Sequence, residues 1–167
     1  PKLYANGFDD VDETLRLEIP TRYAQAYEKI IVQQTRLYDG VYPMLEALSS
    51  VVPMVVVTNK PERLSRLLLE KLGVLKYFKA VIGGDTFAFA KPNPGMLQGA
   101  LEKSGTDEPC VMVGDSAGDV RMSQSYGATS VWCAWGYYER LDDVQPDLIV
   151  QSPSEVVAFV EALIAKG

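Results

Sequence analysis

Residues 111–120, VMVGDSAGDV, join an apolar run to two carboxylates, and no other stretch of the chain is as informative about the fold. An unbroken apolar run is typical of a strand that is buried on both faces of a parallel sheet. Asp115 and Asp119 follow this run, four positions apart. If a helix begins there, both carboxylates lie within one helical turn and face a common point. Two buried carboxylates need a partner, so we expect a cation beside them.

Apolar runs alternate with amphipathic stretches from residue 51 to the end of the chain. This alternation predicts an α/β fold of three layers, a Rossmann-like parallel sheet with helices on both faces. We expect strands at 53–58, 80–82, 110–113, 130–133 and 148–150. We expect helices at 43–49, 61–72, 94–104, 117–126 and 153–166, the last one starting with a capping box between Ser152 and Glu155.

Residues 1–40 differ from the remainder because they contain no convincing strand. Apolar residues at helical spacing predict one helix at 21–38, and the Asp39-Gly40 turn separates it from the next short helix. We therefore expect a helical appendage at 1–40 and an α/β core at 41–167.

Composition excludes several classes of function. The chain has 167 residues and a formal net charge of −6, with no basic run that would suit nucleic acid. It has no apolar stretch near the ~20 residues that span a bilayer. It has no histidine, which excludes Ser-His and Cys-His catalysis and the common zinc sites. Its two cysteines show no metal-binding spacing, so we expect a reduced, cytoplasmic protein.

Polar residues follow three of the expected strands. Thr58 and Asn59 come after the first, Lys91 lies in the loop AKPNP after the second, and Asp115 and Asp119 come after the third. Each pattern alone also fits a plain structural role, as a helix cap, a surface lysine or a turn. Together they lie at one edge of one sheet, where open α/β sheets bind their ligands. A hydroxyl, an ammonium and a cation site are the groups needed to hold and activate a phosphoryl group.

The order TN, then KPNP, then GDSAGD resembles motifs two, three and four of the haloacid dehalogenase-like hydrolase superfamily, in its phosphoglycolate phosphatase-like branch. The resemblance covers about residues 35–152. It implies that Thr58 binds a phosphoryl oxygen, with Asn59 also at the substrate, and that Lys91 pairs with the nucleophile and the phosphate. It implies that Asp115 binds Mg²⁺ directly and that Asp119 supports the metal site. Residues 1–40 would then be part of a mobile cap.

Motif one of that superfamily, D-x-D-G-T after the first and central strand, is not plainly present. Asp10 and Asp12 in FDDVDETL are the one literal candidate, but polar residues precede them and Glu13 replaces the glycine. An acidic loop or helix start is the alternative interpretation. We expect the first strand and motif one to precede Pro1, so that the sheet lacks its central strand between those ending at Thr58 and Asp115. Unpaired backbone would then make residues 1–167 alone neither stable nor active, unless the neighbouring strands close up directly.

The resulting hypothesis is a Mg²⁺-dependent phosphatase, a phosphoric monoester hydrolase that acts on a small phosphorylated metabolite through an aspartyl-phosphate. The alternative is a catalytically inactive protein or fragment that binds a phosphorylated ligand or a partner protein. A receiver domain of a signalling relay also has an α/β layout and an acidic metal site, but its acidic pair is expected near the start of the chain. We expect a monomer or homodimer that binds neither nucleic acid nor membrane.

Overall fold

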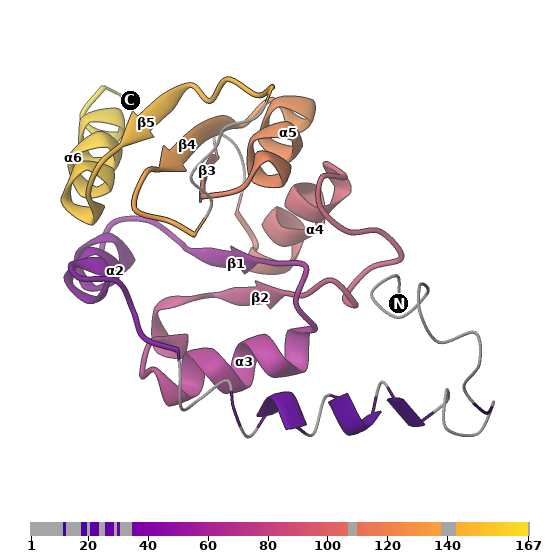
Figure 1. The fold of residues 1–167 in the computed structure, drawn as a ribbon. Helices are drawn as coiled ribbons and strands as arrows, with labels where there is room; N and C mark the ends of the chain where they lie inside the picture. The colour runs from indigo at the N-terminus through magenta and orange to yellow at the C-terminus, as the bar shows by residue number, and fades with distance from the viewer. Residues whose placement is uncertain are drawn as a thin grey trace. The chain divides into compact units, whose positions relative to one another are not determined.

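The computed structural model describes residues 12, 18–19, 21–23, 26–28, 30, 35–106, 110–137 and 143–166 (Figure 1). The chain divides into two units, Pro1–Arg36 and Leu37–Gly167, and each is described by itself. No helix among the described residues is both long enough and apolar enough to cross a bilayer.

Most of the described residues of the first unit are helical. Residues 18–19, 21–23, 26–28 and 30 are helical, whereas residues 35–38 have no regular structure, so the helix expected at 21–38 does not reach its predicted end. Tyr23 and Tyr27 stack with ring centroids 5.6 Å apart, as side chains four positions apart do on a helix. The assignment of this unit to a cap remains a prediction.

The second unit alternates strands and helices and is an α/β fold, as the sequence predicts. Its strands are β1 (Val55–Val57), β2 (Ala80–Ile82), β3 (Val111–Gly114), β4 (Thr129–Cys133) and β5 (Leu148–Val150). Its helices are α2 (Val41–Ser49), α3 (Glu62–Lys71), α4 (Gly95–Ser104), α5 (Ala117–Tyr126) and α6 (Pro153–Ile164), with a short 3-10 helix, η2 (Leu75–Tyr77), that the sequence did not predict.

The described strands form two parallel sheets, with no strand pairing between the two. β1 pairs with β2, and β4 lies between β3 and β5. Within the described part of the chain, β1 and β3 do not pair with each other, so the neighbouring strands have not closed up directly. Val113 of β3 is 36% exposed, which is unusual for an interior position of a parallel sheet.

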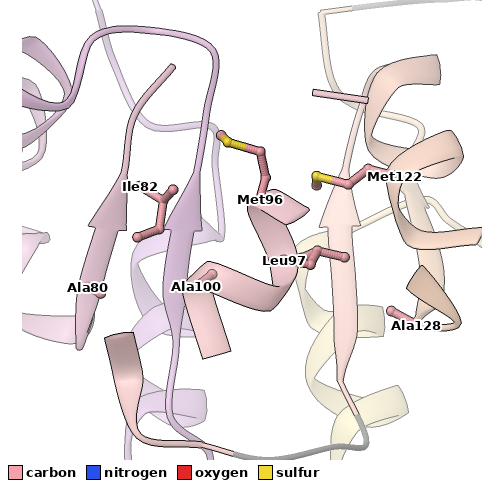
Figure 2. Close-up of a cluster of buried hydrophobic side chains, with 7 residues drawn as sticks. All are labelled: Ala80, Ile82, Met96, Leu97, Ala100, Met122 and Ala128. Atoms are coloured by element: carbon pink, nitrogen blue, oxygen red, sulfur yellow. The ribbon is translucent and has the colours of Figure 1, made fainter. Parts of the chain in front are cut away.

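Helices cover both faces of these sheets. On one face, α4 contacts β1 and β2 while α5 contacts β3 and β4; on the other, α6 packs on β5 and against α2. Figure 2 shows Met96 and Leu97 of α4 between Ile82 of β2 and Met122 of α5. The buried cluster therefore links the two sheets through α4; its members are Ala80, Ile82, Met96, Leu97, Ala100, Met122 and Ala128.

Polar side chains bond to the first turns of α5 and α6 in different ways. Ser116 is the N-cap of α5 and forms a full capping box with Asp119. The capping box expected at α6 is not formed, since Ser152 makes no side-chain cap. Glu155 accepts hydrogen bonds there from the Gln151 N–H and the Ser152 hydroxyl instead, at 3.1 and 3.2 Å.

Candidate functional site

Thr58 follows β1 and presents its hydroxyl at the carboxyl end of that strand. Its N–H donates to the Ile82 carbonyl at 2.9 Å, which extends the pairing of β1 with β2 by one residue. Its Oγ1 accepts the Lys60 N–H at 3.1 Å, at the turn into α3. The hydroxyl proton remains available to donate, so Thr58 can offer a hydrogen bond to an anionic oxygen.

Lys91 reaches from the loop after β2 to the end of β3. Its Nζ lies 2.6 Å from Asp119 Oδ1, and the two side chains are only 14% and 6% exposed. The backbone of Lys91 is held by the Asn59 side chain, whose Oδ1 accepts the Lys91 N–H at 2.9 Å and whose Nδ2 donates to the Lys91 carbonyl at 3.4 Å. The structure thus brings three of the predicted residues, Asn59, Lys91 and Asp119, into direct contact.

Asp119 uses both of its carboxylate oxygens within the protein. Its Oδ2 accepts the Ser116 N–H at 3.1 Å and the Ser116 hydroxyl at 2.6 Å, while Oδ1 accepts from Lys91. A Cβ on Gly114 would lie 2.5 Å from Asp119 Cγ, so the strand end must be glycine for the carboxylate to fold back here. GDSAGD thus does cap α5 through Ser116 and Asp119, and Asp119 also pairs with Lys91; whether it serves a metal site stays a prediction. Sequence reasoning missed Ser116, although its spacing to Asp119 is that of a capping box.

Asp115 lies at the tip of β3 and is fixed by the turn after β4. The Tyr137 N–H donates to its Oδ2 at 2.7 Å. A Cβ on Gly136 would come within 2.2 Å of Asp115 Cβ, so this turn approaches the strand end as closely as only glycine allows. Among the described residues, no hydrogen bond is found to its other oxygen. No signal in the sequence pointed to this contact, because it joins residues 22 positions apart.

Cys133 at the end of β4 is an unreactive neighbour of the carboxylates. Burial, with a further contribution from the negative charges of Asp115 and Asp119, raises the pKa of its thiol to about 12. A thiol with this pKa stays protonated near neutral pH, so Cys133 does not supply a nucleophilic thiolate.

Hydrogen bonds join Asn59 to Lys91, Lys91 to Asp119 and Asp119 to Ser116. Thr58 and Asp115 are connected to this series only as the chain neighbours of Asn59 and Ser116. The candidate motif at Asp10 and Asp12 stays a prediction: Asp10 lies outside the described residues, and Asp12 is an exposed residue of the first unit, which is described by itself. The described residues contain no group of three or more His, Cys, Asp or Glu side chains that could hold a metal ion. The site therefore offers a hydroxyl, a buried ammonium and one carboxylate oxygen.

Comparison with known proteins gives a consistent result. The model of the family described as haloacid dehalogenase-like hydrolase matches residues 5–133. A phosphoglycolate phosphatase from Agrobacterium fabrum is 35% identical over 150 residues, which is 87% of this chain and 64% of that protein. A phosphoglycolate phosphatase from Aliivibrio fischeri is 39% identical over 145 residues, which is 84% of this chain and 64% of that protein.

The fold has a solved counterpart. The crystal structure of a predicted phosphoglycolate phosphatase from Haemophilus somnus superimposes with a TM-score of 0.81 at 25% identity, covering 90% of this chain and 68% of that one. The chain thus spans about two thirds of the length of the relatives it matches. Its three motifs, its α/β fold and the match of the family model agree, and the chain belongs to the haloacid dehalogenase-like hydrolase family.

Proposed function

We propose that this chain carries the phosphate-binding and metal-binding half of a Mg²⁺-dependent phosphatase that hydrolyses a small phosphomonoester resembling phosphoglycolate. The observation that carries the proposal is the Lys91–Asp119 ion pair, which is 2.6 Å long and joins side chains that are only 14% and 6% exposed. A buried ammonium held at a strand end can neutralise a phosphate dianion. The relatives named phosphoglycolate phosphatase suggest which phosphate ester it takes.

Thr58 and Lys91 contact different oxygens of the phosphoryl group. The Thr58 hydroxyl donates to one phosphoryl oxygen, and the Lys91 ammonium shares its remaining hydrogens between a second oxygen and the attacking carboxylate. Asp119 keeps the ammonium in place, because its Oδ1 accepts from Lys91 while two hydrogen bonds from Ser116 hold its Oδ2.

The donor set at the end of β3 fits Mg²⁺ through one carboxylate. Mg²⁺ often keeps several waters and binds proteins through one or two carboxylates together with substrate phosphate. Asp115 presents one oxygen for this purpose while Tyr137 fixes the other. When bound, the ion would neutralise charge on the transferring phosphoryl group.

The nucleophile comes from outside residues 37–167. Its carboxylate oxygen forms a bond to phosphorus, the bond from phosphorus to the ester oxygen breaks, and that oxygen takes a proton from a general acid. Water then attacks the aspartyl-phosphate and releases inorganic phosphate. We propose that this carboxylate belongs to a motif one that precedes Pro1. Asp10 and Asp12 are the alternative candidates.

Turnover measurements test the proposal. The protein is assayed with p-nitrophenyl phosphate and with 2-phosphoglycolate, with Mg²⁺ and with a chelator, and released phosphate is measured. We expect Mg²⁺-dependent turnover that Lys91→Met abolishes. Lys71→Met, which removes an exposed ammonium from the last turn of α3, is the matched control and should retain activity. A folded protein that includes motif one and hydrolyses neither ester would contradict the proposal.

A second candidate is phosphate binding without turnover. It is favoured by one observation: none of the strands described in the second unit ends in the D-x-D-G-T motif. Equilibrium dialysis with inorganic phosphate and Mg²⁺ separates the two candidates. Binding that depends on Lys91, in a protein with intact motif one and no turnover, would support the second.

We also propose a cytoplasmic protein, a monomer or homodimer, whose partner is a small phosphorylated metabolite and not nucleic acid or membrane. The net charge of −6 supports the exclusion of nucleic acid. The helical first unit is proposed as part of a cap that selects the substrate.

A further inference from the structure

The loop between β2 and α4 carries Lys91, and its last residues are tied to the turn after β1. The Asn59 side chain makes two hydrogen bonds to the backbone of Lys91: its Oδ1 accepts the N–H at 2.9 Å, and its Nδ2 donates to the carbonyl at 3.4 Å. A side-chain amide has two N–H donors and two lone pairs, and one of each is used in these two bonds to the Lys91 backbone. The side chain of Asn59 is therefore directed at the lysine that holds phosphate.

The middle of the same loop is seated on α4. Phe87 and Phe89 stack with ring centroids 5.4 Å apart. A Cβ on Gly99 would lie 2.3 Å from the Phe87 ring, and a Cβ on Gly95 would lie 2.8 Å from the Phe89 ring. The two rings thus occupy notches that α4 provides by having glycine on successive turns of one face.

The beginning of the loop is bonded to α3. Asp85 Oδ1 accepts the Glu62 N–H at 2.7 Å, at the first turn of α3. The Thr86 hydroxyl donates to Glu62 Oε2 at 2.7 Å and accepts the Gly83 N–H at 2.8 Å. The loop is consequently fixed at its start, its middle and its end before any ligand arrives.

We propose that Asn59 is a positioning residue that acts through Lys91 and does not itself bind the phosphoryl group. Its amide, together with the Phe87–Phe89 pair on α4, fixes the peptide from which the Lys91 ammonium reaches Asp119. Preorganised donors stabilise a developing charge without reorganising, so a loosened loop weakens the contact of Lys91 with phosphate. This inference rests on the proposed phosphate site at Lys91, and it replaces a ligand role for Asn59 by an indirect one.

A double-mutant cycle distinguishes the two roles of Asn59. The dissociation constant for inorganic phosphate is measured in the presence of Mg²⁺ for the parent protein, Asn59→Ala, Lys91→Ala and the double variant. A positioning role predicts roughly fivefold weaker binding for Asn59→Ala in the parent background, the size expected for one hydrogen bond, and less than about twofold in the Lys91→Ala background. Equal losses in both backgrounds would show direct binding by Asn59 and overturn the inference.

Gln124→Ala is the matched control for this cycle. Gln124 Nε2 donates to the Gln145 carbonyl at 2.7 Å, so this variant also loses one amide hydrogen bond between distant segments, away from the Lys91 loop. It should leave phosphate affinity unchanged. Phe89→Ala removes the second support of the loop and should weaken phosphate binding only where Lys91 is present.

A readout without phosphate keeps the inference separate from the proposed function. The exchange rate of the Lys91 backbone amide is followed by NMR, and Asn59→Ala should accelerate it at least about tenfold while Gln124→Ala does not. If the parent protein binds no phosphate, the proposed function fails and this rate alone decides whether Asn59 holds the loop. An unchanged Lys91 amide rate in Asn59→Ala would overturn the inference, whatever the affinities are.

Discussion

Asp119 is the residue on which the polar contacts of the site converge. It accepts from the Lys91 ammonium and from the Ser116 backbone and hydroxyl, and its side chain is 6% exposed. A carboxylate and an ammonium buried together offset each other's desolvation, but either one alone is costly. The geometry of the ammonium therefore depends on this carboxylate.

Removing Asp119 should destabilise the fold more than removing an exposed acid. We expect Asp119→Leu to lower the free energy of unfolding by about 3 kcal/mol or more, because it leaves the Lys91 ammonium buried without a partner. Urea unfolding followed by circular dichroism measures this. Asp143→Leu is the control, since Asp143 pairs with Arg121 on the surface and such pairs contribute less than about 1 kcal/mol. The Lys91→Met/Asp119→Leu double variant should be more stable than Asp119→Leu, and a double variant that loses the sum of both single effects would contradict this account.

At the scale of the element, apolar runs and breakers predicted the order of strands and helices from residue 41 onward. The strand at 80–82 and the helix at 117–126 have the predicted bounds, because glycine or a polar turn ends each run sharply. The residues at the strand ends, such as Thr58 and Asp115, were predictable for the same reason: parallel topology fixes the edge at which they lie.

The contacts that arrange the site were not predictable in this way. Ser116, the turn at Gly136 and the grip of Asn59 on Lys91 depend on side-chain direction and on loops that approach each other in space. η2 was missed because a 3-10 turn of three residues carries no periodicity. Spacing along the chain places a residue at an edge, whereas packing decides what its side chain touches.

The turn after β4 provides a test at this scale. Gly136→Ala would bring a Cβ within 2.2 Å of Asp115 Cβ, an atom next to the backbone that cannot rotate away. We expect a loss of about 1–3 kcal/mol in the free energy of unfolding, as for other overpacked sites, together with weaker Mg²⁺ binding by isothermal titration calorimetry.

Gly118→Ala is the matched control for that variant. It also adds a methyl group near the site, but its nearest neighbours, Ser116 Oγ and Lys91 Cβ, lie at 3.6 and 4.0 Å. Because Gly118 is inside α5, alanine should stabilise the helix by up to about 1 kcal/mol. If both variants behave alike in thermal unfolding and in Mg²⁺ titration, the close approach at Gly136 does not control Asp115.

At the scale of the whole molecule, no strand pairing joins the two sheets within the described ranges. β1 and β3 each have one strand partner among the described residues, whereas β4 has two. Sequence reasoning reached this arrangement only through the resemblance, since no pattern within a strand says how many neighbours it has. That residues 1–167 alone are neither stable nor active remains a prediction, and its physical basis is the unpaired backbone of these two strands.

Amide hydrogen exchange tests whether β1 and β3 each have unpaired backbone N–H groups along one edge. In a strand, successive residues direct their N–H groups to opposite sides. The bonds from Thr58 N–H to the Ile82 carbonyl and from Thr129 N–H to the Cys110 carbonyl fix which residues face β2 and β4. The intervening residues face the edges that no described strand covers: Val55, Val57, Val111 and Val113.

We expect the amides of these four valines to exchange faster than those of Val56 and Met112, by about tenfold or more, because their N–H groups have no strand to bond to. Amide exchange resolved by NMR measures the ratio, and β4, paired on both sides, provides the protected reference. Fraying or partial unfolding would raise the exchange rates of all amides in a strand together. A difference in rate between successive amides of one strand therefore reports missing strand pairing. Equal protection of the two sets would mean that these edges are covered in solution, by direct pairing of β1 with β3 or by another strand, and the prediction of an open centre would then be wrong.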